Sequence, residues 1–271
     1  MKKEEIIREL ENRGFAVEEQ NVIKNGISRT GIYIRNESNI HPIINLEQII
    51  DDSEKNQKTV SEVADKVINL LRENDNNESL GKLFTDREFV KNHLYIGMQK
   101  SSDENLVLVP CSIPNVEAYL MVKFTQKINN SYDAKVTLEY LNALDIDKDD
   151  AIKMAFEHTC ADTKLVDLMD LLSVPFENRG FMYVLTNTEG HKGAACILNR
   201  EAVLELSMKT HSRRLICIPS SIHEWIIVPH GDAFSMNELK QIIQLVNNDQ
   251  VPAEDQLGNE PYVLDVAKYL N

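Results

Sequence analysis

The chain has 271 residues, enough for one large domain or two modest ones, each with its own hydrophobic core. A hydrophobic share of 42% and a charged share of 27% are those of an ordinary soluble globular protein. The net charge of −14 gives an acidic surface that repels phosphate backbones, so the composition argues against general nucleic-acid binding.

The first elements along the chain are a helix and a hairpin. Residues 3–13 carry apolar side chains at helical spacing, and Gly14 is placed to end that helix. Asn25-Gly26 separates two runs with apolar patterning. Because both central residues of a two-residue hairpin turn take positive φ, this dipeptide predicts a tight hairpin.

A third strand and a long helix are expected next. Residues 39–47 indicate the strand, with Pro42 at its start or at a sheet edge, because proline cannot donate to a strand ladder. Residues 59–73 repeat apolar side chains at the spacing of one helical face, and Thr59 or Ser61 is placed to cap that helix. The polar sequence NDNNES that follows is the expected boundary.

The middle of the chain is predicted to be rich in strands and to end in helices. A short helix from Asp86 to Lys91 opens it. Strands are expected at 94–99, 106–110, 118–124 and 135–140, and helices at 148–158 and 162–172. The acidic run from Asp145 to Asp150 lacks the glycine and the terminal glutamate of a calcium loop, so we interpret it as a carboxylate-rich helix start.

The last part of the chain alternates strands and helices. Strands are predicted at 181–186 and 194–198, a helix at 200–210, and two further strands within 213–229. Ser235 is expected to cap another helix, and an acidic tail at 249–271 either docks or frays.

The fold class that these elements predict is α+β, with mixed or antiparallel sheets and packed helices. Residues 106–113 resemble residues 215–222, and each segment precedes another apolar strand, which suggests two similar α+β units. The predicted regions are therefore 1–78, a helix-hairpin-helix region, 79–175, a first strand-rich unit, and 176–271, a second unit with the C-terminal tail.

The N-terminus and the cysteines indicate a cytoplasmic protein. The opening residues MKKEEIIRELE lack the apolar segment of a signal peptide, and no run approaches the ~18 apolar residues of a transmembrane helix. The four cysteines lie far apart without a CxxC pair, so the sequence supports no structural zinc site. We expect Cys111, Cys160, Cys196 and Cys217 to be reduced, buried thiols, in preference to a disulfide or metal role.

The stretch RRLICIPSSIHEWIIVP at 213–229 holds the densest set of chemically capable side chains. If its centre is extended, Ser221 and His223 share one face, as a nucleophile and a base would, while Glu224 points to the other face. No GxSxG elbow accompanies them. The alternative is that Ser220 and Ser221 satisfy backbone groups in a bend, and that His223 and Glu224 make structural hydrogen bonds.

Ser220, Glu224, His230 and Asp232 are the candidate binding residues of the same stretch. A metal site would recruit His223, His230 and Asp232, but an extended chain would separate the two histidines by ~23 Å. We therefore predict no metal ligand. No GxxxxGK[ST] or GxGxxG motif occurs, so we also predict no nucleotide cofactor.

Two motifs carry a family resemblance, MYVLTN at 182–187 and PSSIHE at 219–224. With Asn-Gly at 25–26 and the NIxP segment at 39–42, they make nearly the whole chain similar to a bacterial (Firmicutes) family of unknown function. That resemblance implies no known activity, cofactor or partner. The chain departs from the family pattern at Cys111, where the family often has histidine, and at Trp225, where it has a smaller aliphatic residue.

We expect a non-catalytic accessory module that binds a protein or a small molecule, because no complete catalytic constellation or cofactor motif occurs. Neither nucleic acid nor membrane is expected as a partner. The alternative is a hydrolase-like enzyme that uses Ser221 and His223. A third option is a structural homo-oligomer joined through edge strands, such as the strand with Pro42.

Overall fold

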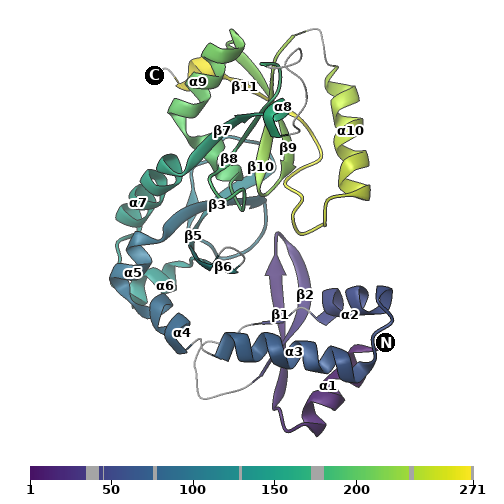
Figure 1. The fold of residues 1–271 in the computed structure, drawn as a ribbon. Coiled ribbons are helices and arrows are strands. Elements are labelled where there is room, and N and C mark those ends of the chain that lie inside the picture. The colour runs from purple at the N-terminus through teal and green to yellow at the C-terminus, as the bar shows by residue number, and fades with distance from the viewer. Residues whose placement is uncertain are drawn as a thin grey trace. The chain divides into compact units, whose positions relative to one another are not determined.

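The computed structural model has the predicted α+β fold, with helices packed on antiparallel sheets (Figure 1). It describes residues 1–34, 43–44, 46–75, 78–127, 130–171, 180–231 and 235–269. The chain divides into two compact units, Met1–Asp86 and Arg87–Asn271. Within the described ranges, no helix combines the length and the apolar composition that crossing a bilayer requires.

The first unit is built from a hairpin and helices. Its elements are α1 (Lys3–Asn12), β1 (Val17–Lys24), β2 (Ile27–Ile34), α2 (Leu46–Lys55), α3 (Val60–Asp75) and α4 (Glu78–Thr85). The predicted turn is confirmed, since β1 pairs antiparallel with β2, and Asn25 and Gly26 take φ of +52° and +73°. Ile6 of α1, Ile32 of β2 and Val67 of α3 are fully buried in one apolar cluster that joins the hairpin to the helices.

Helix α3 begins where the sequence predicts it. The Thr59 N–H donates to Oε2 of Glu62 at 2.8 Å, and the Glu62 N–H donates to Oγ1 of Thr59 at 3.3 Å. These reciprocal bonds form a capping box, which satisfies two backbone donors that a helix start otherwise leaves unpaired.

The strand predicted at 39–47 is mostly outside the described residues, and Pro42 is among those not described. Ile44 makes an isolated antiparallel bridge to β2. Leu46 already begins α2, so the strand prediction is wrong at its end. The sequence LEQIIDDSEK places its apolar side chains on one helical face, and Leu46 is fully buried there.

The second unit contains two sheets, and the first is organised around the long strand β5. Its elements are α5 (Arg87–Asn92), β3 (Leu94–Lys100), β4 (Leu108–Val109), β5 (Val116–Lys127), β6 (Asn130–Lys135), α6 (Leu138–Ala143) and α7 (Lys148–Ala161). β5 pairs with β3, β4 and β6, all antiparallel. Helix α7 packs on β3 (Figure 1), where the Ile96 N–H donates to Oγ1 of Thr159 at 3.0 Å. Asp147 accepts the Asp149 and Asp150 N–H groups at 2.9 and 3.1 Å, so the acidic run begins a helix as predicted.

The second sheet has the strand order β11-β9-β10-β8-β7. Its strands and the helices around it are β7 (Thr163–Asp167), α8 (Leu168–Leu171), β8 (Tyr183–Asn187), η2 (Ala194–Leu198), α9 (Arg200–Thr210), β9 (Arg214–Ser221), β10 (Glu224–Pro229), α10 (Met236–Asp249), β11 (Tyr262–Asp265) and η3 (Val266–Tyr269). Strand β11 pairs with β9, so the acidic C-terminal tail docks as a strand of this sheet.

Three predicted elements of the second unit are corrected. Residues 163–167 form β7 instead of a helix, because they pair with β8 along its whole length. Residues 194–198 form a 3-10 helix instead of a strand, and four of these five residues are buried. The strand predicted at 135–140 is wrong, because β6 ends at Lys135 and α6 begins at Leu138. Thr137 caps this helix by accepting the Tyr140 N–H at 3.2 Å. Short apolar runs suit a helix or a strand equally, so tertiary pairing decides between them.

Of the regions predicted at 79–175 and 176–271, residues 79–86 belong to the first compact unit and all the others to the second. Strand β7 of the former region joins the second sheet. Residues 75 and 78 of the expected boundary are the end of α3 and the start of α4. The two similar segments lead into hairpins, but β4 has two residues and β9 has eight. A duplication therefore stays a prediction.

Candidate functional site

The PSSIHE motif forms the turn of the β9–β10 hairpin. β9 ends at Ser221 and β10 begins at Glu224, so Ile222 and His223 make the turn. The Ile222 N–H donates to the Asp255 carbonyl at 2.8 Å, which ties this turn to the C-terminal segment. Two buried strands with a polar break between them were predicted here, and the hairpin confirms them.

Both serine hydroxyls of the motif bind the same carboxylate. Oγ of Ser220 donates to Oε1 of Glu224 at 2.9 Å, and Oγ of Ser221 donates to the same oxygen at 3.0 Å. The expectation that Glu224 faces away from Ser221 is wrong, because the chain turns between them and makes them cross-strand partners. Oγ of Ser221 also accepts the His223 backbone N–H at 3.0 Å. This buried hydroxyl is therefore engaged as both donor and acceptor.

The His223 ring points to other groups. Its Nδ1 accepts the Lys192 N–H at 3.0 Å, and its Nε2 lies 3.9 Å from Oδ1 of Asp255. An acceptor Nδ1 places the ring hydrogen of a neutral imidazole on Nε2, toward that carboxylate. The ring also lies 4.9 Å from the ring of His191, centroid to centroid. The structure therefore directs the imidazole to Lys192 and Asp255, and the Ser221 hydroxyl to Glu224.

The remaining binding candidates are placed apart from this turn. The His230 N–H donates to the Arg214 carbonyl at 2.9 Å, just beyond the far end of β10 from the motif. Asp232 lies outside the described residues. Among the residues that the structure describes, no group of three or more His, Cys, Asp or Glu side chains is arranged to hold a metal ion.

A pocket of about 110 Å³ borders the motif. Pro219 of β9 and Trp225 of β10 line it, together with Pro114 and Asn115 from the β4–β5 connection and residues 257–262 of the C-terminal segment. The pocket therefore lies where both sheets of the second unit meet the tail. Sequence reasoning selected the motif and missed the pocket, because its walls come from three distant segments.

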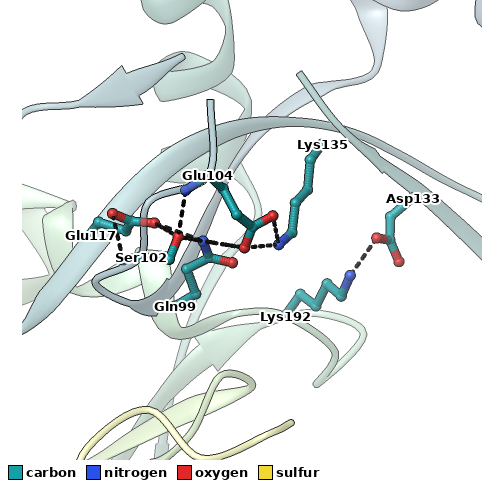
Figure 2. A network of polar contacts seen from close by, with 7 residues as sticks. All are labelled: Gln99, Ser102, Glu104, Glu117, Asp133, Lys135 and Lys192. Carbon is teal, nitrogen blue, oxygen red and sulfur yellow. Dashed lines mark hydrogen bonds and ion pairs between the residues drawn. The ribbon is translucent and has the colours of Figure 1, made fainter. Parts of the chain in front are cut away.

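A second polar feature covers one face of the first sheet. Along β5, Glu117, Tyr119, Lys123 and Thr125 alternate with buried apolar residues, which places them on one face. Figure 2 shows the network at one end of this face. Nε2 of Gln99 contacts Oε1 of Glu117 at 2.7 Å. The same nitrogen lies 3.1 Å from Oγ of Ser102 and 3.1 Å from Oε1 of Glu104. The period-two pattern was visible in the sequence, but the partners were not.

Lys135 neutralises one carboxylate of this network. Its Nζ contacts the two carboxylate oxygens of Glu104 at 2.7 and 2.6 Å (Figure 2). The phenol of Tyr119 is buried next to Gly97, where an added Cβ would meet the Tyr119 ring at 2.6 Å. Burial raises the pKa of Tyr119, and the charges of Asp133, Glu104 and Glu117 raise it further, so this phenol stays protonated at neutral pH.

Ion pairs connect this face to the loop at 188–193. Nζ of Lys123, whose side chain is 3% exposed, lies 2.6 Å from Oε2 of Glu189, and Lys192 pairs with Asp133 (Figure 2). Burial opposes ionisation of Glu189, but hydrogen bonds from Lys123 and Thr125 outweigh it and lower the pKa of the carboxyl. The loop follows β8 of the second sheet, and its ion pairs with Lys123 and Asp133 therefore connect that sheet to β5 and β6 of the first.

A family model described as "Family of unknown function (DUF5688)" matches residues 2–265. The chain belongs to this family. Its resemblance to a family of unknown function is thereby confirmed, while the bacterial origin stays an expectation. No curated protein and no solved structure matches this family member.

The four cysteines of this DUF5688 protein are free thiols. Burial raises the pKa of all four, to about 12 for Cys196. A thiol with a raised pKa carries little thiolate at neutral pH and is a poor nucleophile. Cys196 and Cys217 are buried as expected, but the expectation is wrong for Cys111 and Cys160, which are half-buried.

Proposed function

We propose that this protein is a cytoplasmic, non-catalytic binding module that takes a small ligand, or a side chain of a partner, in the pocket beside the PSSIHE hairpin. The observation that carries the proposal is the composition of the pocket. Proline rings and aromatic side chains provide apolar walls, and Asn115, Asn259 and Glu260 provide a few polar groups. Ligand sites in proteins combine apolar walls with a small number of polar groups in this way.

The hydrogen bonds of the motif support a scaffolding role for its polar residues. Ser220 and Ser221 donate to Glu224, and the imidazole of His223 accepts from Lys192. A serine nucleophile needs a base within reach of its hydroxyl and a donor set for the oxyanion. The bonds instead hold the turn rigidly next to Pro219 and Trp225, which line the pocket.

Trp225 makes the proposal directly measurable, because it is the only tryptophan of the chain. Its indole is 1% exposed, and Nε1 donates to the Ala194 carbonyl at 2.9 Å. A ligand that enters the pocket changes the surroundings of this ring. We therefore expect saturable changes in tryptophan emission, with a rise in melting temperature, when the full chain is titrated with a fragment library.

Two glycine variants decide whether such binding occurs in this pocket. A Cβ at Gly258 would make only ordinary contacts, with Pro219 at 3.5 and 3.8 Å, so Gly258→Leu is expected to place its side chain against the pocket wall at Pro219. Gly231 is exposed and an added Cβ meets nothing within 4 Å, so Gly231→Leu is the matched control. We expect Gly258→Leu to abolish binding and Gly231→Leu to preserve it. A library without any saturable binder, or a Gly258→Leu variant that binds normally, would refute the proposal.

The hydrolase alternative makes an opposite prediction for Ser221→Ala. If Ser221 is a nucleophile, the variant keeps the fold and loses hydrolysis of p-nitrophenyl esters. If Ser221 is a structural donor, no such activity exists to lose. The variant then costs about 1–3 kcal/mol of unfolding free energy, because the half-buried Glu224 carboxylate and the His223 N–H each lose a hydrogen bond. Esterase assays and urea denaturation on the same preparations separate these outcomes.

A further inference from the structure

We infer that the pocket beside Trp225 recognises a primary ammonium group carried on a short aliphatic chain. This inference rests on the proposed function and names the chemical class of its ligand. Three properties of the pocket lead to it, namely its size, its walls and the charge at its rim.

The size selects a short ligand. The volume of about 110 Å³ is well below the ~300–1,000 Å³ of pockets that hold drug-sized molecules. It still exceeds the ~10–15 Å³ that one water molecule requires. A chain of a few methylene groups with one polar end fits such a space.

The walls suit an aliphatic stem. Pro114, Pro219 and Pro261 line the pocket with saturated rings, and Tyr262 adds an aromatic ring. Methylene groups gain by leaving water for surfaces of this kind, at ~25 cal/mol for each Å² of apolar area. An aromatic ring also attracts an alkylammonium through its negative face.

The rim selects a positive charge. Glu260 is the one charged residue among the described residues that line the pocket. The other polar lining groups include Asn259 and Gly258, whose oxygens accept from Nδ2 of Asn247 at 2.8 and 2.9 Å. The chain as a whole carries a net charge of −14, which attracts cations toward the surface.

Glu260 already binds a primary ammonium in this structure, because Nζ of Lys240 pairs with its carboxylate. The Glu260 side chain is 61% exposed, and the Lys240 side chain is 41% exposed. An exposed ion pair is weak, since water and salt screen it. A ligand ammonium whose stem is buried in the pocket therefore exchanges with Lys240 at small cost, and it gains contacts that Lys240 does not make there.

The test compares three probes of similar shape on the full chain, followed by Trp225 emission at fixed pH and ionic strength. These are n-pentylamine, pentan-1-ol and pentanoate, which carry a positive, a neutral and a negative end. We expect the amine to bind about tenfold or more tightly than the alcohol, as for a charge-assisted hydrogen bond. Pentanoate is expected to bind more weakly than either. Cadaverine and Nα-acetyl-lysine methylamide then distinguish a free diamine from a lysine side chain of a peptide.

Two carboxylate variants locate the preference. Glu260→Gln removes the rim charge and is expected to reduce the preference for the amine to about twofold or less. Glu205→Gln is the matched control, because Glu205 is also exposed and paired with a lysine, Lys209, but lies on α9 and does not line the pocket. Lys240→Gln frees Glu260 and is expected to tighten amine binding.

The results separate the preference for an ammonium group from the existence of a binding pocket. Equal binding of amine and alcohol, or a preference that survives in Glu260→Gln, overturns the ammonium inference and leaves the binding pocket standing. The ammonium inference is also overturned, and the pocket still stands, if the amine fails to bind while neutral fragments bind and Gly258→Leu blocks their binding. If no probe and no fragment binds, the inference and the proposed function fall together.

Discussion

The buried ammonium of Lys123 offers the most direct test of what holds the two sheets of the second unit together. Its Nζ contacts Oε2 of Glu189 at 2.6 Å and the His191 carbonyl at 3.3 Å, and it lies 5.6 Å from the ring centroid of Tyr95. Glu189→Gln removes the only carboxylate that the structure pairs with this lysine among the described residues, and it changes little else in shape. The lysine then remains buried without a counter-charge.

The cost follows from the exposure of the two partners. Removing one member of a fully buried ion pair destabilises a protein by about 3–5 kcal/mol, because a charge is left uncompensated. The Lys123 side chain is 3% exposed, but that of Glu189 is 38% exposed, so water screens the pair from one side. We therefore expect Glu189→Gln to cost roughly 1–3 kcal/mol. Lys123→Met leaves the carboxylate in contact with water and keeps an unbranched stem, so it should cost less.

Urea denaturation followed by Trp225 emission measures these costs, because the tryptophan lies in the second unit and reports its unfolding. The double variant completes a cycle in which the effects of the single variants should not add. In that cycle, Lys123→Met is expected to rescue part of the loss caused by Glu189→Gln. A Glu189→Gln variant within about 0.5 kcal/mol of the parent would refute the reasoning, because that is the range of ordinary surface substitutions.

Two further predictions concern the same loop. Burial lowers the pKa of His191, with the charges of His223 and Lys192 adding to the effect, so the unfolded state binds this proton more readily than the folded state. Stability should therefore fall as the pH drops through about 6.5, the pKa of unperturbed histidine, and His191→Gln should reduce this dependence in urea titrations at pH 7.5 and 5.5. The prediction would be contradicted if the free energy of unfolding of His191→Gln fell between pH 7.5 and 5.5 by as much as that of the parent. Gly193→Ala should cost about 1–3 kcal/mol, since its Cβ would lie 2.5 Å from the backbone nitrogen of Asn187 and 2.8 Å from the His223 carbonyl oxygen. Gly231→Ala is the control in thermal melts, because its added Cβ meets nothing, whereas Gly190 in the same loop takes a φ of +64° that would strain any substitution. Equal melting temperatures for Gly193→Ala and Gly231→Ala would exclude the close packing at Gly193.

Local features of this chain followed from its sequence. The Asn25-Gly26 turn, the Thr59 cap and the Asp147 helix start each depend on neighbours a few residues away, and each lies where the sequence predicts it. The PSSIHE motif was likewise placed in a bend between two buried strands. These predictions succeeded because backbone conformation and capping are decided by short-range sterics and hydrogen bonds.

Local patterns predicted the wrong element where pairing or packing with distant segments decides. The apolar run at 194–198 is buried as a 3-10 helix, while residues 163–167 extend because β8 is available to pair with them. The candidate site was affected in the same way. A turn returns Glu224 to Ser221, so the serine hydroxyls bind a carboxylate instead of the imidazole.

The sequence by itself determined the α+β class, the Asn25-Gly26 and PSSIHE hairpins, and the Thr59 and Asp147 helix starts. Ser235 also precedes its predicted helix, but its side chain makes no capping hydrogen bond there. Only the tertiary structure decided which side chains meet. Lys123 lies on β5 of the first sheet, whereas Glu189 lies in the loop that follows β8 of the second sheet. The pocket likewise joins the β4–β5 connection, the PSSIHE hairpin and the C-terminal segment. Periodicity along a chain shows which face a residue occupies, but it contains no information about the segment that will cover that face.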